Sequence, residues 1–163
     1  MPRIFYSEQQ RFNQSFTLLI IVPVLAITSY QIFEIVADNT RTITNEELIG
    51  LIIAFVLTIG VGLLLYNMRL MVQIDDEKIH VRFRPFVNRT IYWTDVEQAY
   101  IIRYKPIMDY GGWGIRRRFG KIAYSVAGKD GLQLKLKDGK QILIGTQKPE
   151  EVKLLLKKRL EEA

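Results

Sequence analysis

Two uncharged apolar runs dominate the first part of the chain, at residues 15–33 and 48–66. A helix of this length spans about 28 Å, close to the roughly 30 Å hydrocarbon core of a bilayer. The pattern predicts transmembrane helices at 15–36 and 48–68, a connecting loop at 37–47 and an N-terminal tail at 1–14. The alternatives are two buried core helices or a cleaved signal peptide. Cleavage is disfavoured because the first run is longer than a usual signal core and no A-x-A site follows it.

From residue 69 onward the apolar period changes to two, as in half-buried strands. Turn residues separate the alternating segments, and Asp138-Gly139 is a strong hairpin signal. A C-terminal helix is expected after Pro149, with acidic residues in its first turn and basic residues near its end. The predicted class is therefore α+β: a two-helix hairpin, then an antiparallel seven-strand barrel or sandwich with a capping helix at 69–163. The strands are expected near 69–75, 78–84, 89–93, 96–104, 121–127, 131–137 and 140–145.

Charge is distributed very unevenly along the chain. Of 23 Lys and Arg residues, only Arg3, Arg11 and Arg41 precede residue 67. The segment between the apolar runs is mainly acidic, and the region after them is basic. Because Lys and Arg favour the cytoplasmic side, both termini are expected in the cytoplasm and the loop outside. This predicts a multi-pass protein of the cell membrane.

Composition excludes several kinds of chemistry. The chain has no cysteine, so thiolate metal sites are excluded, and its one histidine, His80, cannot by itself build a zinc site. The carboxylates fall mostly at turns, and no phosphate-binding loop or hydrolase motif occurs. We therefore expect no enzyme activity, metal or cofactor. A nucleic-acid partner is not expected either, since membrane topology already accounts for the basic charge.

Small residues recur every four positions on the second apolar run. This spacing places them on one helix face, where another backbone can approach closely. The face would pack against the first helix or form the seam of a homo-oligomer. Its members are Gly50, Ala54, Thr58 and Gly62.

A basic cluster follows a glycine-rich stretch in what the pattern predicts to be a long loop. Arginines near an anionic leaflet contribute about 1 kcal/mol each, and tryptophan suits the interface. The cluster would bind anionic lipid headgroups or an acidic partner; the alternative is a solvated run of charges. Its members are Trp113, Arg116, Arg117, Arg118 and Lys121.

The order of predicted elements resembles the pleckstrin-homology-like (PH-like) fold, and most of all bacterial PH-domain proteins of the inner membrane with an N-terminal transmembrane hairpin. The resemblance covers residues 69–163 and, more loosely, the whole chain. It is carried by Ile91-Tyr92-Trp93-Thr94-Asp95-Val96, by Gly111-Gly112-Trp113-Gly114-Ile115-Arg116, and by the stretch from Gly131 through Asp138-Gly139-Lys140 to Gln147 that leads into Pro149-Glu150-Glu151.

The resemblance implies a binding or scaffolding module without a family-wide catalytic residue. We expect a membrane-anchored module that recruits a protein partner or organises a membrane complex, with exposed strand edges as a route to partner peptides. The alternative is a sensor of anionic lipid headgroups at the inner leaflet. A remote alternative is a membrane-surface enzyme.

Overall fold

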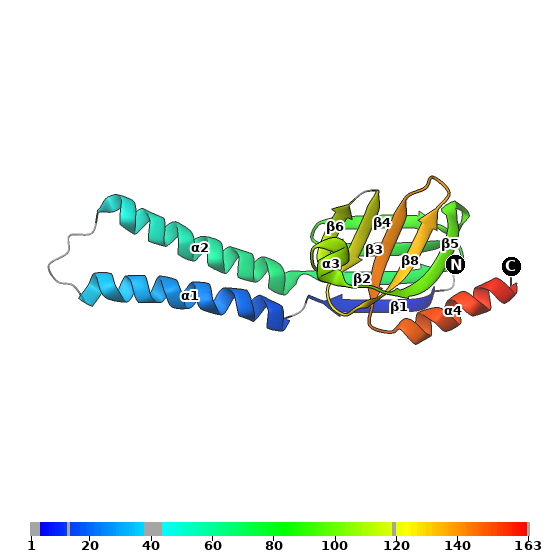
Figure 1. The fold of residues 1–163 in the computed structure, drawn as a ribbon, viewed down its shortest axis with the longest axis horizontal. Helices are drawn as coiled ribbons and strands as arrows, with labels where there is room; N and C mark the ends of the chain where they lie inside the picture. The colour runs from blue at the N-terminus through cyan, green and yellow to red at the C-terminus, as the bar shows by residue number, and fades with distance from the viewer. Residues whose placement is uncertain (1–3, 13, 38–43, 119, 163) are drawn as a thin grey trace. The chain divides into compact units, whose positions relative to one another are not determined.

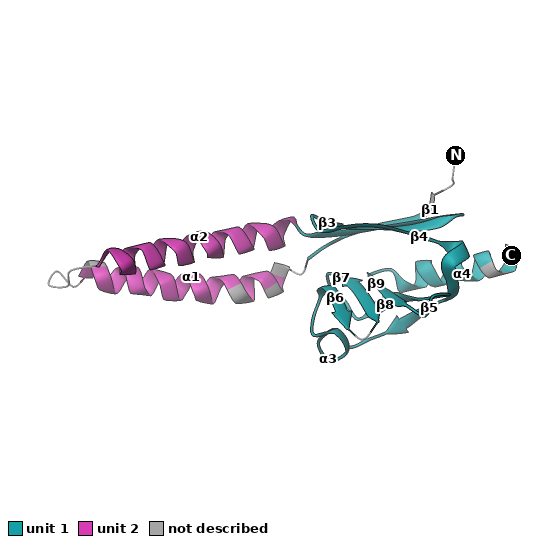
Figure 2. Ribbon diagram, turned by 90° about the horizontal axis from the view of Figure 1, so that it is seen from above, with its two compact units in different colours: residues 1–12, 68–163 teal, residues 13–67 magenta. Residues whose placement is uncertain are grey.

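The computed structural model describes residues 4–12, 14–37, 44–118 and 120–162. The chain divides into two compact units (Figure 2), residues 13–67 and residues 1–12 together with 68–163. We call them the helical unit and the β unit. The predicted loop at 37–47 falls largely on 38–43, outside the described residues.

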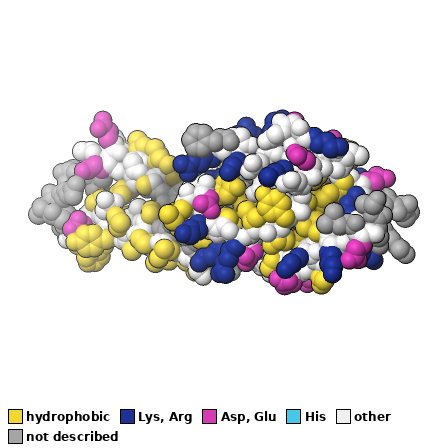
Figure 3. Space-filling view, turned by 45° about the vertical axis from the view of Figure 1, so that its right-hand side comes forward, with side chains coloured by type: hydrophobic (Ala, Val, Ile, Leu, Met, Phe, Trp, Pro, Cys, Tyr) yellow, Lys and Arg dark blue, Asp and Glu magenta, His cyan; other side chains and the backbone are white. Residues whose placement is uncertain are grey.

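The helical unit is a hairpin of two long helices lying side by side, α1 (Gln14–Ala37) and α2 (Asn45–Asn67) (Figure 1). By length and composition, both are long and apolar enough to cross a membrane. Only 6% of the apolar window of α1 and none of that of α2 is buried. The structure therefore contradicts the alternative of two buried core helices. Figure 3 shows apolar side chains on the visible part of the hairpin, whereas Lys and Arg lie on the β unit.

The first sheet of the β unit has four antiparallel strands in the order β1-β2-β3-β4. Strands β2 (Arg69–Asp75) and β3 (Lys78–Arg84) lie where the alternating pattern predicts them, and β4 spans Val87–Tyr92. Strand β1 (Ile4–Arg11) was not predicted, because the sequence pattern indicated only an N-terminal tail there. The hairpin is thus inserted between two strands, β1 and β2, that pair with each other.

The second sheet has five strands in the order β5-β8-β9-β7-β6. A 3-10 turn, η1 (Trp93–Asp95), leads from the first sheet into it. The prediction of a wholly antiparallel sheet is wrong at one place, because β7 and β9 run parallel. The strands are β5 (Val96–Arg103), β6 (Gly114–Arg118), β7 (Lys121–Ser125), β8 (Asp130–Leu136) and β9 (Gln141–Thr146).

The two sheets form two layers around an apolar core (Figure 2). The described strands remain two separate sheets, so the barrel alternative is wrong and a two-layer arrangement holds. Helix α4 (Pro149–Glu162) ends the chain as predicted and packs on β5, β8 and β1. The largest fully buried apolar side chains are Leu70, Ile74, Ile79, Val81, Phe83, Val126, Leu132, Leu134, Ile142, Leu143 and Ile144.

Strand β1 joins the two layers through a buried polar cluster. Glu8 is only 6% exposed. Its carboxylate accepts hydrogen bonds from the Thr146 hydroxyl at 2.7 Å, from the Gln147 amide at 2.8 Å and from the Tyr6 hydroxyl. Gln10 donates from its side-chain amide to the Gly145 carbonyl at 2.7 Å. Burial, followed by the hydrogen bond to Glu8, raises the pKa of Tyr6, which keeps this phenol protonated as a donor.

Candidate functional site

Strand β5 is an edge strand of the five-stranded sheet. Its one partner among the described strands is β8, with Ala99 opposite Leu134 and Ile101 opposite Leu132. The other edge of β5 therefore has no strand beside it. An unpaired edge presents backbone N–H and C=O groups to which another extended segment can bond.

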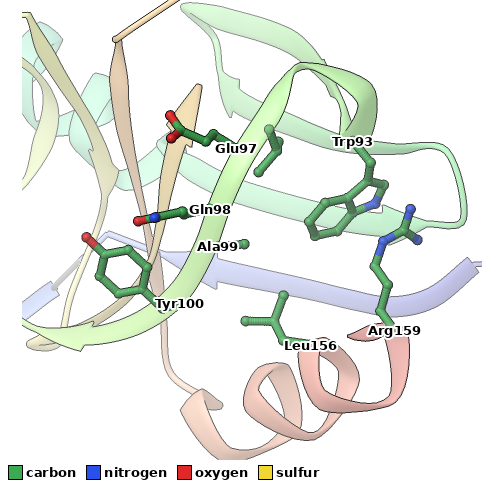
Figure 4. Close-up of a pocket in the computed structure, with 8 residues that line it drawn as sticks. Trp93, Glu97, Gln98, Ala99, Tyr100, Leu156 and Arg159 are labelled. Carbon is green, nitrogen blue, oxygen red and sulfur yellow. The ribbon is translucent and has the colours of Figure 1, made fainter. Parts of the chain in front are cut away.

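A cavity of about 490 Å³ runs along β5 on the side of helix α4. Five consecutive strand residues, from Val96 to Tyr100, line it together with Trp93, Leu156 and Arg159. Figure 4 shows Trp93 beside Arg159 at one end, Tyr100 toward the other, and Ala99 facing the side of the cavity where Leu156 rises from the helix. We call this cavity the β5–α4 groove. It combines an open strand edge with apolar side chains, the combination that binds extended peptides by strand addition.

The Trp93 end of the groove is held in place from two sides. The indole Nε1 donates to the Asp75 carbonyl at 3.0 Å, which ties the ring to the first sheet. The Arg159 guanidinium carbon lies 4.4 Å from the ring centroid, in cation–π contact. This end of the groove is therefore pre-formed.

We expect Arg159→Ala to lower the free energy of unfolding by about 1 kcal/mol, because both side chains of this cation–π pair are half-buried. Urea titration followed by tryptophan fluorescence measures this. Lys153→Ala, at an exposed position of the same helix, is the control. An equal loss in both variants would mean that the contact with Trp93 contributes nothing specific.

The three arginines of the basic cluster, predicted as part of a loop, lie in strand β6, whereas Trp113 directly precedes this strand and Lys121 begins β7. Arg116 and Arg118 pair with Ala123 and Lys121, whereas Arg117 pairs with Ile122. Because side chains alternate along a strand, Arg117 points to the opposite face from the other two arginines. The structure therefore separates the predicted cluster into two faces.

Three members of this cluster have hydrogen bonds to the backbone of their own region. The Trp113 indole donates to the Gly128 carbonyl at 3.0 Å, so it anchors its own loop. Arg116 Nε donates to the Trp113 carbonyl at 3.2 Å, and Arg118 Nη1 donates to the Met108 carbonyl at 3.4 Å. These bonds use part of the donor capacity that the sequence analysis assigned to headgroups.

A short helix, α3 (Pro106–Tyr110), is a feature that the sequence pattern did not reveal. It ends at Gly111, whose φ of 74° is the left-handed conformation that glycine favours. Two large apolar side chains on it, Ile107 and Met108, are 68% and 69% exposed. In the sequence, the apolar pair directly after Lys105-Pro106 is the local feature that could have indicated these two residues.

Most of the small-residue face of α2 lies toward α1. Ala54, Thr58 and Gly62 are half-buried, whereas Gly50 is exposed. A Cβ on Gly62 would come within 2.8 Å of the Ile21 side chain, so glycine allows close approach there. The Thr58 hydroxyl donates to the Ala54 carbonyl of its own helix at 2.7 Å. The homo-oligomer alternative remains a prediction.

The described residues contain no group of three His, Cys, Asp or Glu side chains placed to hold a metal ion. Comparison with known proteins adds no assignment: no family model matches the chain, and no curated protein matches its sequence.

Proposed function

We propose that this protein is a non-enzymatic, membrane-anchored binding module that holds an extended segment of a partner protein in the β5–α4 groove. In the proposed arrangement the hairpin crosses the cell membrane and the β unit lies in the cytoplasm. The layered sheets with a C-terminal helix are what a PH-like domain would have, which supports the resemblance of the sequence.

The observation that carries the proposal is the coincidence of a free strand edge with an apolar cavity. A bound segment would add to β5 through main-chain hydrogen bonds and place alternate side chains in the groove. Apolar side chains would pack between Trp93, Ala99 and Leu156. Glu97 and Arg159 would select polar neighbours of opposite charge.

The pairing of β1 with β2 supports the proposed topology. Arg11, at the end of β1, pairs with Arg69, at the start of β2. The chain therefore leaves for α1 and returns from α2 at neighbouring points of one sheet, as a hairpin with both ends on one side requires. A cleaved signal peptide would remove β1, whose side chains are built into the core.

Anionic-lipid sensing is a second candidate, favoured by the exposed Ile107 and Met108. Apolar side chains of this kind suit the interfacial region of a bilayer. Nearby segments carry Trp113, Arg116, Arg118 and Lys121, although the first three of these side chains already donate to backbone carbonyls of their own region. Binding of this kind should weaken steeply with salt, unlike apolar capture in the groove.

Site-specific photo-crosslinking in native membranes tests the proposed function. A crosslinker at Gln98, an exposed residue of the groove, should capture a discrete partner whose crosslinked peptide contains apolar residues at alternate positions. Filling the groove with Ala99→Phe should abolish this product. Ser7→Phe, at an exposed position of β1, should leave it unchanged.

Two outcomes would contradict the proposal. One is the same product from a crosslinker at Lys137, which lies outside the groove lining. The other is undiminished crosslinking in an Ala99→Phe protein whose thermal unfolding matches the wild type. Loss of crosslinking supports the proposal when the Ala99→Phe protein also unfolds at the same temperature as the wild type. This comparison separates a blocked groove from a misfolded domain.

A further inference from the structure

Three arginines occupy one row across the first sheet. Arg11 on β1 pairs with Arg69 on β2, and Arg69 pairs with Arg84 on β3. Directly opposite residues of antiparallel strands have Cβ atoms about 4.5–5.5 Å apart. We call Arg11, Arg69 and Arg84 the arginine row.

The arginine row faces away from the core. Each arginine has a buried neighbour along its strand, Gln10, Leu70 and Phe83 respectively, and these neighbours are at most 1% exposed. Because alternate side chains point to opposite faces, the three arginines share the outer face of the sheet. Arg11 and Arg84 are exposed, and Arg69 is half-buried.

The row has no compensating anion within the described part of the chain. Like charges directly opposite on a sheet repel and destabilise the pairing. The next outward-facing row consists of Gln9, Met71 and Arg82, with no carboxylate. Among the described residues no ion pair involves any member of the row. This concentration of charge favours an external anion.

The position of the row along the chain indicates which anion. Two residues separate Arg11 from the start of α1, and only Met68 separates α2 from Arg69. At no more than about 3.6 Å per residue, both arginines lie within roughly 11 Å of a helix end. Phe86, 56% exposed, occupies the turn beside Arg84. Exposed aromatic and basic side chains at helix ends are typical of the headgroup region.

We propose that the arginine row binds the phosphate groups of anionic phospholipids in the membrane that holds the hairpin. Guanidinium groups match phosphate oxygens with paired, charge-assisted hydrogen bonds. A row of three would bind one or two adjacent headgroups and relieve the repulsion between the strands. This inference rests on the hairpin crossing a membrane but not on the β5–α4 groove.

Native mass spectrometry of the full-length protein tests the inference. Protein is released from mixed micelles holding equal amounts of phosphatidylglycerol and phosphatidylcholine, and the ratio of retained lipids is measured. The wild type should retain phosphatidylglycerol at least tenfold over phosphatidylcholine, since each of the three arginines near an anionic lipid contributes a several-fold preference. The triple variant Arg11→Gln, Arg69→Gln, Arg84→Gln should fall to near parity.

A matched control removes three charges elsewhere: Lys129→Gln, Lys137→Gln and Lys153→Gln, all at exposed positions of the β unit. This variant should keep the wild-type ratio. Equal loss in both triple variants would show a general charge effect and overturn the inference, as would a wild type without preference. Complete competition by inorganic phosphate or by a short oligonucleotide at equal phosphate concentration would also overturn it, because the row would then be a site for soluble anions.

Discussion

Replacing Glu8 by alanine should lower the free energy of unfolding of the β unit by about 3 kcal/mol. The carboxylate accepts hydrogen bonds from Thr146, Gln147 and Tyr6, and hydrogen bonds to a charged group are worth about 1.5–3 kcal/mol each in stability. Part of this sum is offset because the variant no longer buries a carboxylate. Removal leaves buried donors without their acceptor and releases the tie between β1 and β9. For a unit of this size the change corresponds to a fall in Tm of roughly 10 °C or more.

Thermal unfolding of the full-length protein in detergent, followed by tryptophan fluorescence, measures this effect because both tryptophans, Trp93 and Trp113, lie in the β unit. The control is Gln9→Ala, the neighbouring exposed residue on β1, which should change stability by no more than about 0.5 kcal/mol. If Glu8→Ala were as mild as its control, β1 would not be part of the folded unit.

Replacing Leu57 by arginine should severely reduce the insertion of α2 into the membrane. Leu57 lies near the middle of the helix and is 61% exposed. On insertion scales leucine at the helix centre is favourable by about 0.5 kcal/mol and arginine unfavourable by about 2.5–3.5 kcal/mol. The difference of roughly 3 kcal/mol lowers the equilibrium constant for insertion of α2 by about a hundredfold or more.

The matched control is Leu48→Arg, in the first turn of the same helix, where the charge can reach the interface. After carbonate extraction of membranes, the Leu57→Arg protein should be in the supernatant or lost to degradation in the cell, and the Leu48→Arg protein should stay in the membrane pellet. A hairpin exposed to water would show the opposite trend, since arginine for an exposed leucine would then leave expression unchanged or improve it.

The sequence predicted those parts of the fold in which side-chain polarity follows the period of the element. Residues 69–75 and 78–84 alternate cleanly, and β2 and β3 have the predicted bounds. Strand β1 was missed because two of its inward-facing residues, Glu8 and Gln10, are polar. Hydrogen bonds from the opposite layer satisfy Glu8 in the core, and no periodicity reveals such partners.

Strand β6 was missed for a different reason. Three consecutive arginines carry no alternation, because β6 is an edge strand and these side chains are exposed on both faces. The parallel pairing of β7 with β9 depends on contacts between distant segments and has no local signal. The β5–α4 groove likewise combines a turn, a strand and a helix that are separate in sequence, so only tertiary structure brings Trp93 beside Arg159.

In the proposed arrangement, β1 and the rest of the β unit lie on one side of the membrane and the hairpin tip lies on the other. The chain has no cysteine, so single cysteines can be placed freely. In intact cells a membrane-impermeant maleimide should label Glu46→Cys, and it should label Ser7→Cys and Lys137→Cys only after permeabilisation. Labelling of Ser7→Cys or Lys137→Cys in intact cells, or protection of Glu46→Cys there, would contradict this account.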